Sequence, residues 1–274
     1  MSSELQAELD ALPSRVLVEK YRAAMDDEDN DLWFLIPVHH RGGQEEFDIG
    51  VEYCRSPDPK DRAVGTNVLA QLGGANPTFR EESISVLLPM LDDPDNFVVY
   101  CAAVALGHRC AESAIDPLVR LSYHSDPRIR FGAVIGLMCH QDQRVIRVLI
   151  ERISDSDFDT RNWATCGLGS FIRADSPDIR AALRLALKDS DSEVRGEALF
   201  GLALRKDPSV VDEILHEWQN DEVSMLSLEA AEEIADPRLL ERMEHLTAVI
   251  DPETQEVRFR QLQSAKEACK SKAE

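Results

Sequence analysis

The chain has 274 residues, of which 43% are apolar, and its formal net charge at pH 7 is −21. The apolar fraction is sufficient for a hydrophobic core, which argues against a largely disordered protein. An acidic surface repels a phosphate backbone, so we expect no nucleic-acid partner. The net charge has two interpretations: it keeps an elongated protein soluble, or it attracts a basic protein partner.

No targeting or membrane segment is predicted. The first 12 residues are acidic and lack the basic start and the apolar run of a signal peptide. No stretch approaches 18 consecutive apolar residues, so we expect no membrane-spanning helix and no membrane partner. The six cysteines form no C-x-x-C pair, and we interpret them as reduced thiols of a cytoplasmic protein.

Residues 1–42 are predicted to form a helical N-terminal cap. Two short amphipathic helices are expected at 3–11 and 13–25, and an acidic turn at 26–31 is expected to cap a helix that begins at Leu32. Such a cap covers the apolar face that the end of a repeat array would otherwise expose to water.

A recurring string organises residues 43–235. Its best copy places Arg130, Ala133 and Leu137 on one helical face, after an aspartate in a turn at Asp126. The aspartates that open the copies are Asp61, Asp95, Asp126, Asp157, Asp191 and Asp221, at steps of 34, 31, 31, 34 and 30 residues. A fixed period in this range indicates stacked supersecondary units.

Each repeat is predicted to contain a first helix and a second helix, and the second helix carries the string. The first helices are predicted at 43–55, 77–91, 111–124, 142–154, 176–189 and 208–219, and the second helices begin near the six aspartates. Residues 236–274 are predicted to form a C-terminal helical cap with a charged tail, in which Asp236-Pro237 opens a last apolar helix that ends near Ile250.

These strings resemble HEAT repeats, in particular the short HEAT-like repeats of phycobilin lyase subunits. The best-matching segments are 126–133, 157–169 and 191–199. The resemblance implies an all-α fold, an α-solenoid of about six stacked antiparallel helix pairs with helical caps. It also implies a binding scaffold more than any particular activity. The first two repeats depart from the family at Gly65 and Val99, where the family usually has arginine.

The string has a physical interpretation of its own. The aspartate can accept backbone N–H groups at the start of the second helix, and an arginine one turn later can reach an aspartate of its own or the next repeat. We predict a structural ladder of Asp126, Arg130, Asp157, Arg161, Asp191 and Arg195. Anion binding by these arginines is a less favoured alternative. Another column, which contains Gly136, Gly167 and Gly201, predicts close approach of neighbouring second helices.

No catalytic, metal-binding or cofactor motif stands out. The seven histidines have no metal-ligand spacing. The adjacent pair His39-His40 would point about 100° apart on a helix, which disfavours a shared metal site. We therefore expect no cofactor, no metal and no catalytic residue, and an enzyme with an unrecognised site is the alternative.

Candidate partner-binding residues follow the arginine column by one, two or five positions, away from the predicted core face. They are Tyr100, Phe131, Asn162, Trp163, Glu197 and Phe200. These side chains either pack between neighbouring second helices or line a groove for a peptide or helix on the concave side of the solenoid. Trp163 is the strongest anchor candidate, because an indole combines a large apolar face with one N–H donor.

The favoured function is a monomeric, non-catalytic scaffold or adaptor that binds a protein segment in this groove. A basic partner is compatible with the net charge, as for an immunity-type protein that neutralises a basic toxin or enzyme. The alternatives are a subunit of a phycobilin-lyase-like enzyme, which needs a chromophore-binding groove, and a HEAT-like DNA glycosylase, which needs a basic groove.

Overall fold

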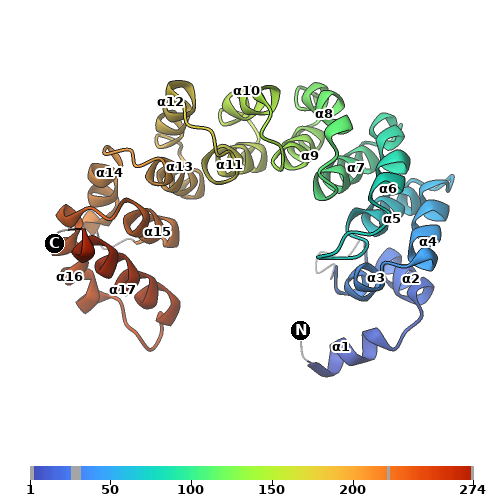
Figure 1. Cartoon of the computed structure of the whole chain (residues 1–274), viewed down its shortest axis with the longest axis horizontal. Coiled ribbons are helices and arrows are strands. Elements are labelled where there is room, and N and C mark those ends of the chain that lie inside the picture. The colour runs from blue at the N-terminus through green and yellow to red at the C-terminus, as the bar shows by residue number, and fades with distance from the viewer. Residues whose placement is uncertain (1–2, 26–31, 221–222, 273–274) are drawn as a thin grey trace. The chain divides into compact units, whose positions relative to one another are not determined.

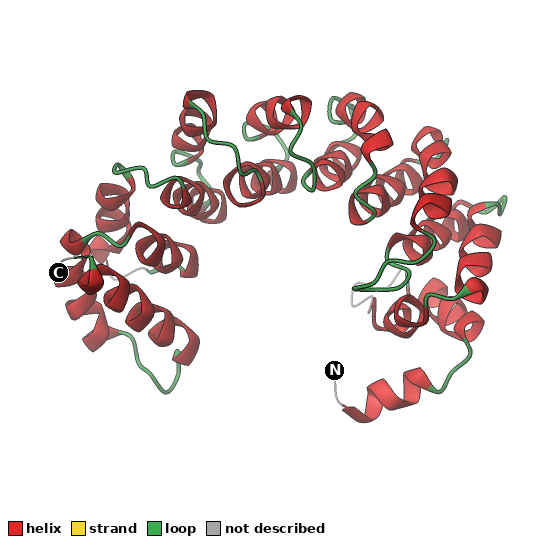
Figure 2. Cartoon of the chain, in the orientation of Figure 1, coloured by secondary structure: helices red, strands yellow, loops and turns green. Residues whose placement is uncertain are grey.

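A computed structural model describes residues 3–25, 32–220 and 223–272. Helices and turns account for these residues, and no strand occurs among them (Figure 2). The predicted all-α class is therefore confirmed. The helices group into two units, Met1–His140 and Gln141–Glu274. The acidic turn predicted at 26–31 lies outside the described residues.

The first unit begins with the helices predicted for the N-terminal cap and continues into the repeats. Its elements are α1 (Ser3–Asp10), α2 (Ser14–Ala24), η1 (Leu32–Phe34), α3 (Leu35–Arg41), α4 (Gln44–Cys54), α5 (Pro59–Ala70), α6 (Arg80–Leu87), η2 (Leu88–Asp92), α7 (Asn96–His108), η3 (Glu112–Ala114), α8 (Ile115–Leu121) and α9 (Pro127–Leu137).

The second unit continues the alternation of first and second helices. Its elements are α10 (Gln143–Arg152), α11 (Phe158–Cys166), the π-helical turn η4 (Gly167–Phe171), α12 (Pro177–Ala186), α13 (Ser192–Leu204), α14 (Val210–Glu217), η5 (Trp218–Asn220), α15 (Met225–Ile234), η6 (Pro237–Leu239), α16 (Leu240–Val249) and α17 (Glu256–Ser271).

Within each unit the second helices form a layer of their own (Figure 1). In the first unit α3, α5, α7 and α9 follow one another in this second-helix layer, and α4, α6 and α8 lie against it. In the second unit the layer contains α11, α13, α15 and α17, partnered by α10, α12, α14 and α16. This stacking of helix pairs confirms the predicted α-solenoid.

Aspartate side chains begin most of the second helices, as the recurring string predicts. The N-cap residues of α7, α9, α11 and α13 are Asp95, Asp126, Asp157 and Asp191. In α7, Oδ1 of Asp95 accepts the N–H of Phe97 at 2.9 Å. A cap of this kind stabilises a helix by about 1 kcal/mol.

The second helix of the first repeat begins three residues earlier than predicted. Its N-cap is Asp58 and not Asp61, because Pro59 occupies the first helical position, where proline is favoured. Oδ1 of Asp58 accepts the N–H of Lys60 at 3.0 Å. Arg62, rather than Gly65, therefore stands four residues after the cap, so this repeat follows the string more closely than the sequence analysis supposed.

The last repeat also differs from its prediction. Helix α15 begins at Met225, and its N-cap is Ser224, whose Oγ accepts the N–H of Ser227 at 3.0 Å. Asp221, near which the helix was expected to begin, lies outside the described residues. Asp236 caps η6 as predicted, and α17 occupies much of the charged tail.

The alanine and leucine columns of the string form the core. Each of these side chains has no measurable exposure: Ala102, Ala133, Ala164, Ala198, Leu106, Leu137, Leu168 and Leu202. Full burial of one leucine contributes about 1.5–3 kcal/mol. The leucines contribute most of the apolar area of these columns, and the small alanines let neighbouring helices approach one another.

Close helix approach explains two of the three glycines in the predicted column, Gly136 and Gly201. A Cβ atom at Gly136 of α9 would lie 2.6 Å from the carbonyl oxygen of Ala103 on α7. One at Gly201 of α13 would lie 2.5 Å from the Cα of Gly169 in η4. Both distances are too short for a side chain, so the helix packing requires glycine at these positions.

Candidate protein-binding surface

The arginines of the predicted ladder bind the carbonyl groups of the preceding turn. Nη1 of Arg130 donates to the carbonyl oxygens of His124 and Ser125 at 3.0 and 3.1 Å. Arg161 and Arg195 make the same pair of contacts with the residues six and five positions before them. Each guanidinium thus closes the turn that leads into its own helix, which is a structural role.

Two arginines of this column also pair with an aspartate of the next turn. Nε of Arg62 lies 2.7 Å from Oδ2 of Asp93, and Nε of Arg161 lies 2.9 Å from Oδ2 of Asp189. These aspartates precede the N-caps by two residues, whereas the predicted ladder used the N-cap aspartates, whose carboxylates accept backbone N–H groups instead. Burial raises the pKa of Asp189, but the N–H of Asp191 and the Arg161 guanidinium outweigh it and lower this pKa below its ordinary value.

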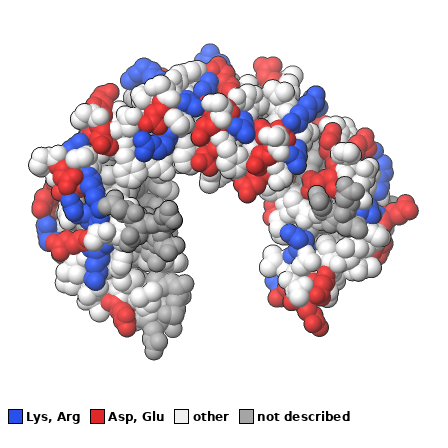
Figure 3. All heavy atoms as spheres, turned by 180° about the vertical axis from the view of Figure 1, so that it is seen from behind, with Lys and Arg blue, Asp and Glu red and all other residues white. Residues whose placement is uncertain are grey.

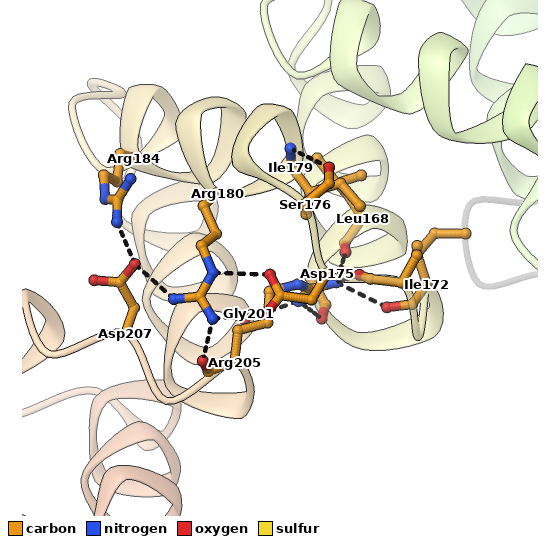
Figure 4. Close-up of polar contacts among 12 residues, drawn as sticks. Leu168, Ile172, Asp175, Ser176, Ile179, Arg180, Arg184, Gly201, Arg205 and Asp207 are labelled. Carbon is orange, nitrogen blue, oxygen red and sulfur yellow. Dashed lines mark hydrogen bonds and ion pairs between the residues drawn. The ribbon is translucent and has the colours of Figure 1, made fainter.

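Two arginines that the string did not single out, the buried Arg109 and the half-buried Arg205, close the ends of second helices. Arg109, after α7, donates through Nε to the carbonyl of Leu69 at 2.8 Å and through Nη1 to that of Leu72 at 3.2 Å. Arg205, after α13, donates to five carbonyl groups in and around η4 and α13 (Figure 4). Burial lowers the pKa of Arg109 to about 10, so its guanidinium stays charged at pH 7. Each stands ten residues after the column position, a spacing that could have identified them.

The ion cluster beside Arg205 is likewise structural (Figure 4). The side chain of Asp207 is 1% exposed, and its Oδ2 lies 3.1 Å from Nη1 of Arg180 and also contacts Arg184. Its Oδ1 accepts the N–H and hydroxyl of Ser209 at 3.1 and 2.7 Å. Burial raises the pKa of Asp207, but these partners together lower it below its ordinary value. The cluster satisfies its own charges and leaves little for a ligand.

In the first unit, the predicted aromatic residues lie side by side. The ring centroids of Tyr100 on α7 and Phe131 on α9 are 5.9 Å apart, and Phe97 stacks on Tyr100 at 6.0 Å. Phe97 is 38% exposed, whereas Tyr100 and Phe131 are half-buried. The row therefore packs between neighbouring second helices and also leaves aromatic surface in solvent. We name Phe97, Tyr100 and Phe131 the aromatic row.

In the second unit, the predicted residues lie on α11 and α13. The indole of Trp163 is 40% exposed, while Asn162, Glu197 and Phe200 are half-buried. Nδ2 of Asn162 lies 3.4 Å from Oε2 of Glu193, a glutamate that the sequence analysis did not select. Oδ1 of Asn162 is buried and has no hydrogen-bond partner among the described residues. The Oδ1 atom of Asn162, close to the Glu193 carboxylate, can therefore accept a hydrogen bond from a ligand.

Glu197 is the most perturbed carboxylate of this surface. Burial raises its pKa, and the negative charges of Glu229 on α15 and Glu193 on α13 raise it further, while a hydrogen bond from the Cys166 thiol lowers it. The net pKa is raised, so the charged form of Glu197 lacks a cation that would stabilise it. We name Asn162, Trp163, Glu193 and Glu197, with Glu229, the acidic patch.

Acidic and basic side chains are interspersed over the face shown in Figure 3. Among the residues that the structure describes, no group of three or more histidine, cysteine or carboxylate side chains is placed to hold a metal ion. Within the same residues, no helix is long and apolar enough to cross a membrane.

Comparisons with known proteins identify the repeats. Residues 51–138 and 100–169 match the family model for HEAT repeats. Protein YibA of Escherichia coli (strain K12) is 28% identical over 207 residues, which cover 73% of this chain and 73% of YibA. The X-ray structure of YibA has a TM-score of 0.72 at 23% identity and covers 98% of this chain and 97% of its own, a likeness that concerns the fold.

A second structure is a more distant match. The complex of CpcE and CpcF of phycocyanin lyase from a Nostoc species aligns at 14% identity with a TM-score of 0.49, over 94% of this chain and 95% of that chain. This likeness is too low to support an argument about function. The family match does not depend on it: residues 51–169 match the family model for HEAT repeats, which confirms the resemblance inferred from the sequence.

Proposed function

We propose that this chain is a non-catalytic interaction protein that binds a basic segment of a protein partner on its second-helix layer. The observation that carries the proposal is the raised pKa of Glu197, half-buried between the like charges of Glu193 and Glu229. A lysine or arginine brought to this carboxylate relieves the repulsion and stabilises its charged form. An inhibitor that neutralises a basic enzyme is one case of such a protein.

Two neighbouring groups support a cationic ligand. The exposed face of Trp163 can receive a guanidinium or ammonium group, an interaction of about 0.5–1 kcal/mol at exposed sites. The open Oδ1 of Asn162 can accept one of the N–H groups that these cations carry. An arginine side chain can contact all three groups at once. Its planar guanidinium donates hydrogen bonds in several directions, to Glu197 and Asn162, and stacks on aromatic rings such as Trp163.

Site-specific photo-crosslinking in the source cell tests this proposal. A photoreactive side chain is placed at Trp163 on the second-helix layer, or at Leu185 of α12, whose side chain is 56% exposed. We expect a specific adduct at position 163, with the crosslinked partner peptide rich in lysine or arginine, and no adduct of that partner at 185. The same partner crosslinked only at 185, or a partner segment without basic residues, refutes the proposal.

A charge-matched pair of variants completes the test with the partner so found. Glu197→Gln removes one negative charge from the acidic patch, and Glu213→Gln removes one from an exposed position on α14. The first should weaken binding of the partner roughly tenfold, because it removes a charge-assisted contact. The second should change it little. Equal effects of the two variants would mean that only the overall charge of the chain matters.

A further inference from the structure

A cavity of about 490 Å³ opens in the first unit among α2, α3, α5 and α7. Small-ligand sites in proteins usually measure about 300–1,000 Å³, so the cavity can hold a group of several ring atoms. Second helices supply most of its wall, which places it in the same layer as the aromatic row (Figure 1). Phe97 and Tyr100 belong to both, so the cavity adjoins the aromatic row directly.

The wall of the cavity is apolar and aromatic. Phe97 and Tyr100 contribute rings from α7, and Leu35, Ile36 and Val104 contribute aliphatic groups. Aromatic rings pack favourably against such walls, and each pair of rings adds about 0.5–1.5 kcal/mol beyond the burial of area. The shape and composition favour a flat aromatic group over a flexible charged chain.

Two polar groups in the wall have unused hydrogen-bonding capacity. Nε2 of His39 donates to the carbonyl oxygen of Asn67 at 2.9 Å, so the neutral imidazole keeps Nδ1 as an acceptor. Nδ2 of Asn67 donates to the hydroxyl oxygen of Tyr21 at 2.8 Å. Tyr21 is 2% exposed, and no group among the described residues accepts its own hydroxyl proton. The oxygen of a tyrosine ligand could accept from this buried hydroxyl, whereas an indole N–H can only donate.

Four titratable groups that line the cavity are uncharged at pH 7. Burial lowers the pKa of His39 to about 4 and raises the pKa of Tyr21 to about 12. Burial also lowers the pKa of His108 and raises the pKa of Cys101 to about 12. A charged ligand would lose its hydration here without meeting an opposite charge, so the cavity selects for neutral groups.

We propose that this cavity binds one uncharged aromatic side chain of the partner segment, a tyrosine or a tryptophan, whose ring O–H or N–H is accepted by His39. That the side chain belongs to a protein partner rests on the proposed function. That the ligand is an uncharged aromatic ring rests on the cavity alone.

Capped amino acids test the ring chemistry without the partner. N-acetyltryptophanamide, N-acetyltyrosinamide and N-acetylargininamide are titrated into the full chain and followed by protein NMR. We expect the two aromatic amides to bind with a Kd on the order of 1 mM and to shift the Val104 methyl signals, and the arginine amide not to do so. No binding of either aromatic amide, or equal binding of the arginine amide at this site, overturns the proposal.

Two pairs of variants locate the binding. Val104→Trp fills the cavity, and Ile135→Trp places the same ring at the equivalent position of α9, outside it. Where Val104→Trp does not fold, Phe97→Ala removes an exposed wall residue, with Phe158→Ala as its control at a similar exposure of 37%. The cavity variants should raise the Kd at least roughly tenfold and the controls should not. Equal effects within each pair overturn the assignment.

Two further titrations are needed. The first distinguishes a partner side chain from a free small molecule as the ligand, and the second distinguishes the cavity proposal from the proposed function. Free indole and p-cresol are titrated beside the amides, and binding of these without binding of the amides assigns the cavity to a small molecule and overturns the side-chain proposal. Glu197→Gln is titrated as well, and it should leave the Kd of the aromatic amides unchanged. Amides that bind a chain whose crosslinking fails would show that the proposed function is wrong and the cavity chemistry right.

Discussion

Arginine side chains stabilise this protein mainly through main-chain carbonyl groups. Arg205 donates to five carbonyls, and Arg109 to three. Carbonyl groups at helix ends lack partners within the helix, and a guanidinium presents several donors in a fixed plane. One buried arginine can therefore satisfy the end of a helix and the turn beside it, which fixes how consecutive repeats meet.

Arg161→Ala should destabilise the chain by about 1–3 kcal/mol, because it removes both carbonyl contacts and the ion pair with Asp189. Arg195→Ala is the matched comparison, since the contacts of Arg195 are with carbonyl groups. Its loss should be smaller. Chemical denaturation of both variants measures the difference, and an unchanged midpoint for Arg161→Ala would show that its contacts contribute nothing to stability.

Trp163→Ala should cost stability less than the about 3–5 kcal/mol of a fully buried aromatic residue, because its side chain is 40% exposed. Binding of the partner should weaken by about 2 kcal/mol or more if the indole is an anchor. Thermal unfolding and titration with the partner, performed on the same variant, separate the two roles. A large loss of stability with normal binding by the folded fraction would place Trp163 in the packing between helices.

His39 should make stability fall as the pH drops from about 6.5 toward about 4. Its pKa in the folded chain, about 4, is below its unfolded value, so in this window the unfolded chain binds more protons and acid favours unfolding. The contribution of His39 to the free energy of unfolding is fully present above the pKa of histidine in the unfolded chain, about 6.5. The lowered pKa values of Asp189 and Asp207 act at lower pH. Denaturation of His39→Gln across this range should show a flatter dependence, and an identical pH profile would count against the buried, neutral histidine.

At the scale of elements, the sequence predicted the helices well because each repeat carries several independent signals. Second helices such as α9 and α13 combine an N-cap aspartate, a buried alanine and leucine column and a glycine at the contact. The first repeat was misread because Asp58 and Asp61 both precede a plausible helix, and only the proline between them decides the register. The π-helical turn η4 had no signal that we recognised.

Gly201→Ala should destabilise the second unit by about 1–3 kcal/mol, because its Cβ would lie 2.5 Å from the Cα of Gly169 and the backbones must separate. Gly43→Ala is the control, since its Cβ would meet only the end of the Glu46 side chain, at 3.0 Å. Urea denaturation compares the two variants with the parent chain. Comparable stability of all three would mean that α13 and η4 pack less tightly than these distances indicate.

At the scale of the molecule, the candidate site was only partly predictable. The spacing after the arginine column predicted Trp163 and Glu197, which stand at the same position of successive repeats. It missed Glu229, because the effect of this residue on Glu197 depends on a distance between α15 and α13 and not on the repeat position. It also missed Glu193, although Glu193 stands four residues before Glu197 on the same helix, a spacing visible in the sequence. The cavity was also missed, since it joins α2 and α3, which lie outside the repeats, to α5 and α7. Features built from the repeat pattern can be predicted from sequence, whereas contacts between unlike segments require the structure.

The net charge of −21 and the acidic patch act on different steps of binding. Charge spread over the chain steers a basic partner before contact, and salt screens it over about 10 Å at 0.1 M ionic strength. We therefore expect the association rate constant to fall steeply as salt is raised from low to high concentration, while the dissociation rate constant changes little. Trp163→Ala should raise the dissociation rate constant and leave the association rate constant nearly unchanged, because contacts formed after docking determine how fast the partner leaves. Stopped-flow measurements on the parent chain and this variant separate the two effects, and an association rate insensitive to salt would leave the acidic excess with the role of solubility alone.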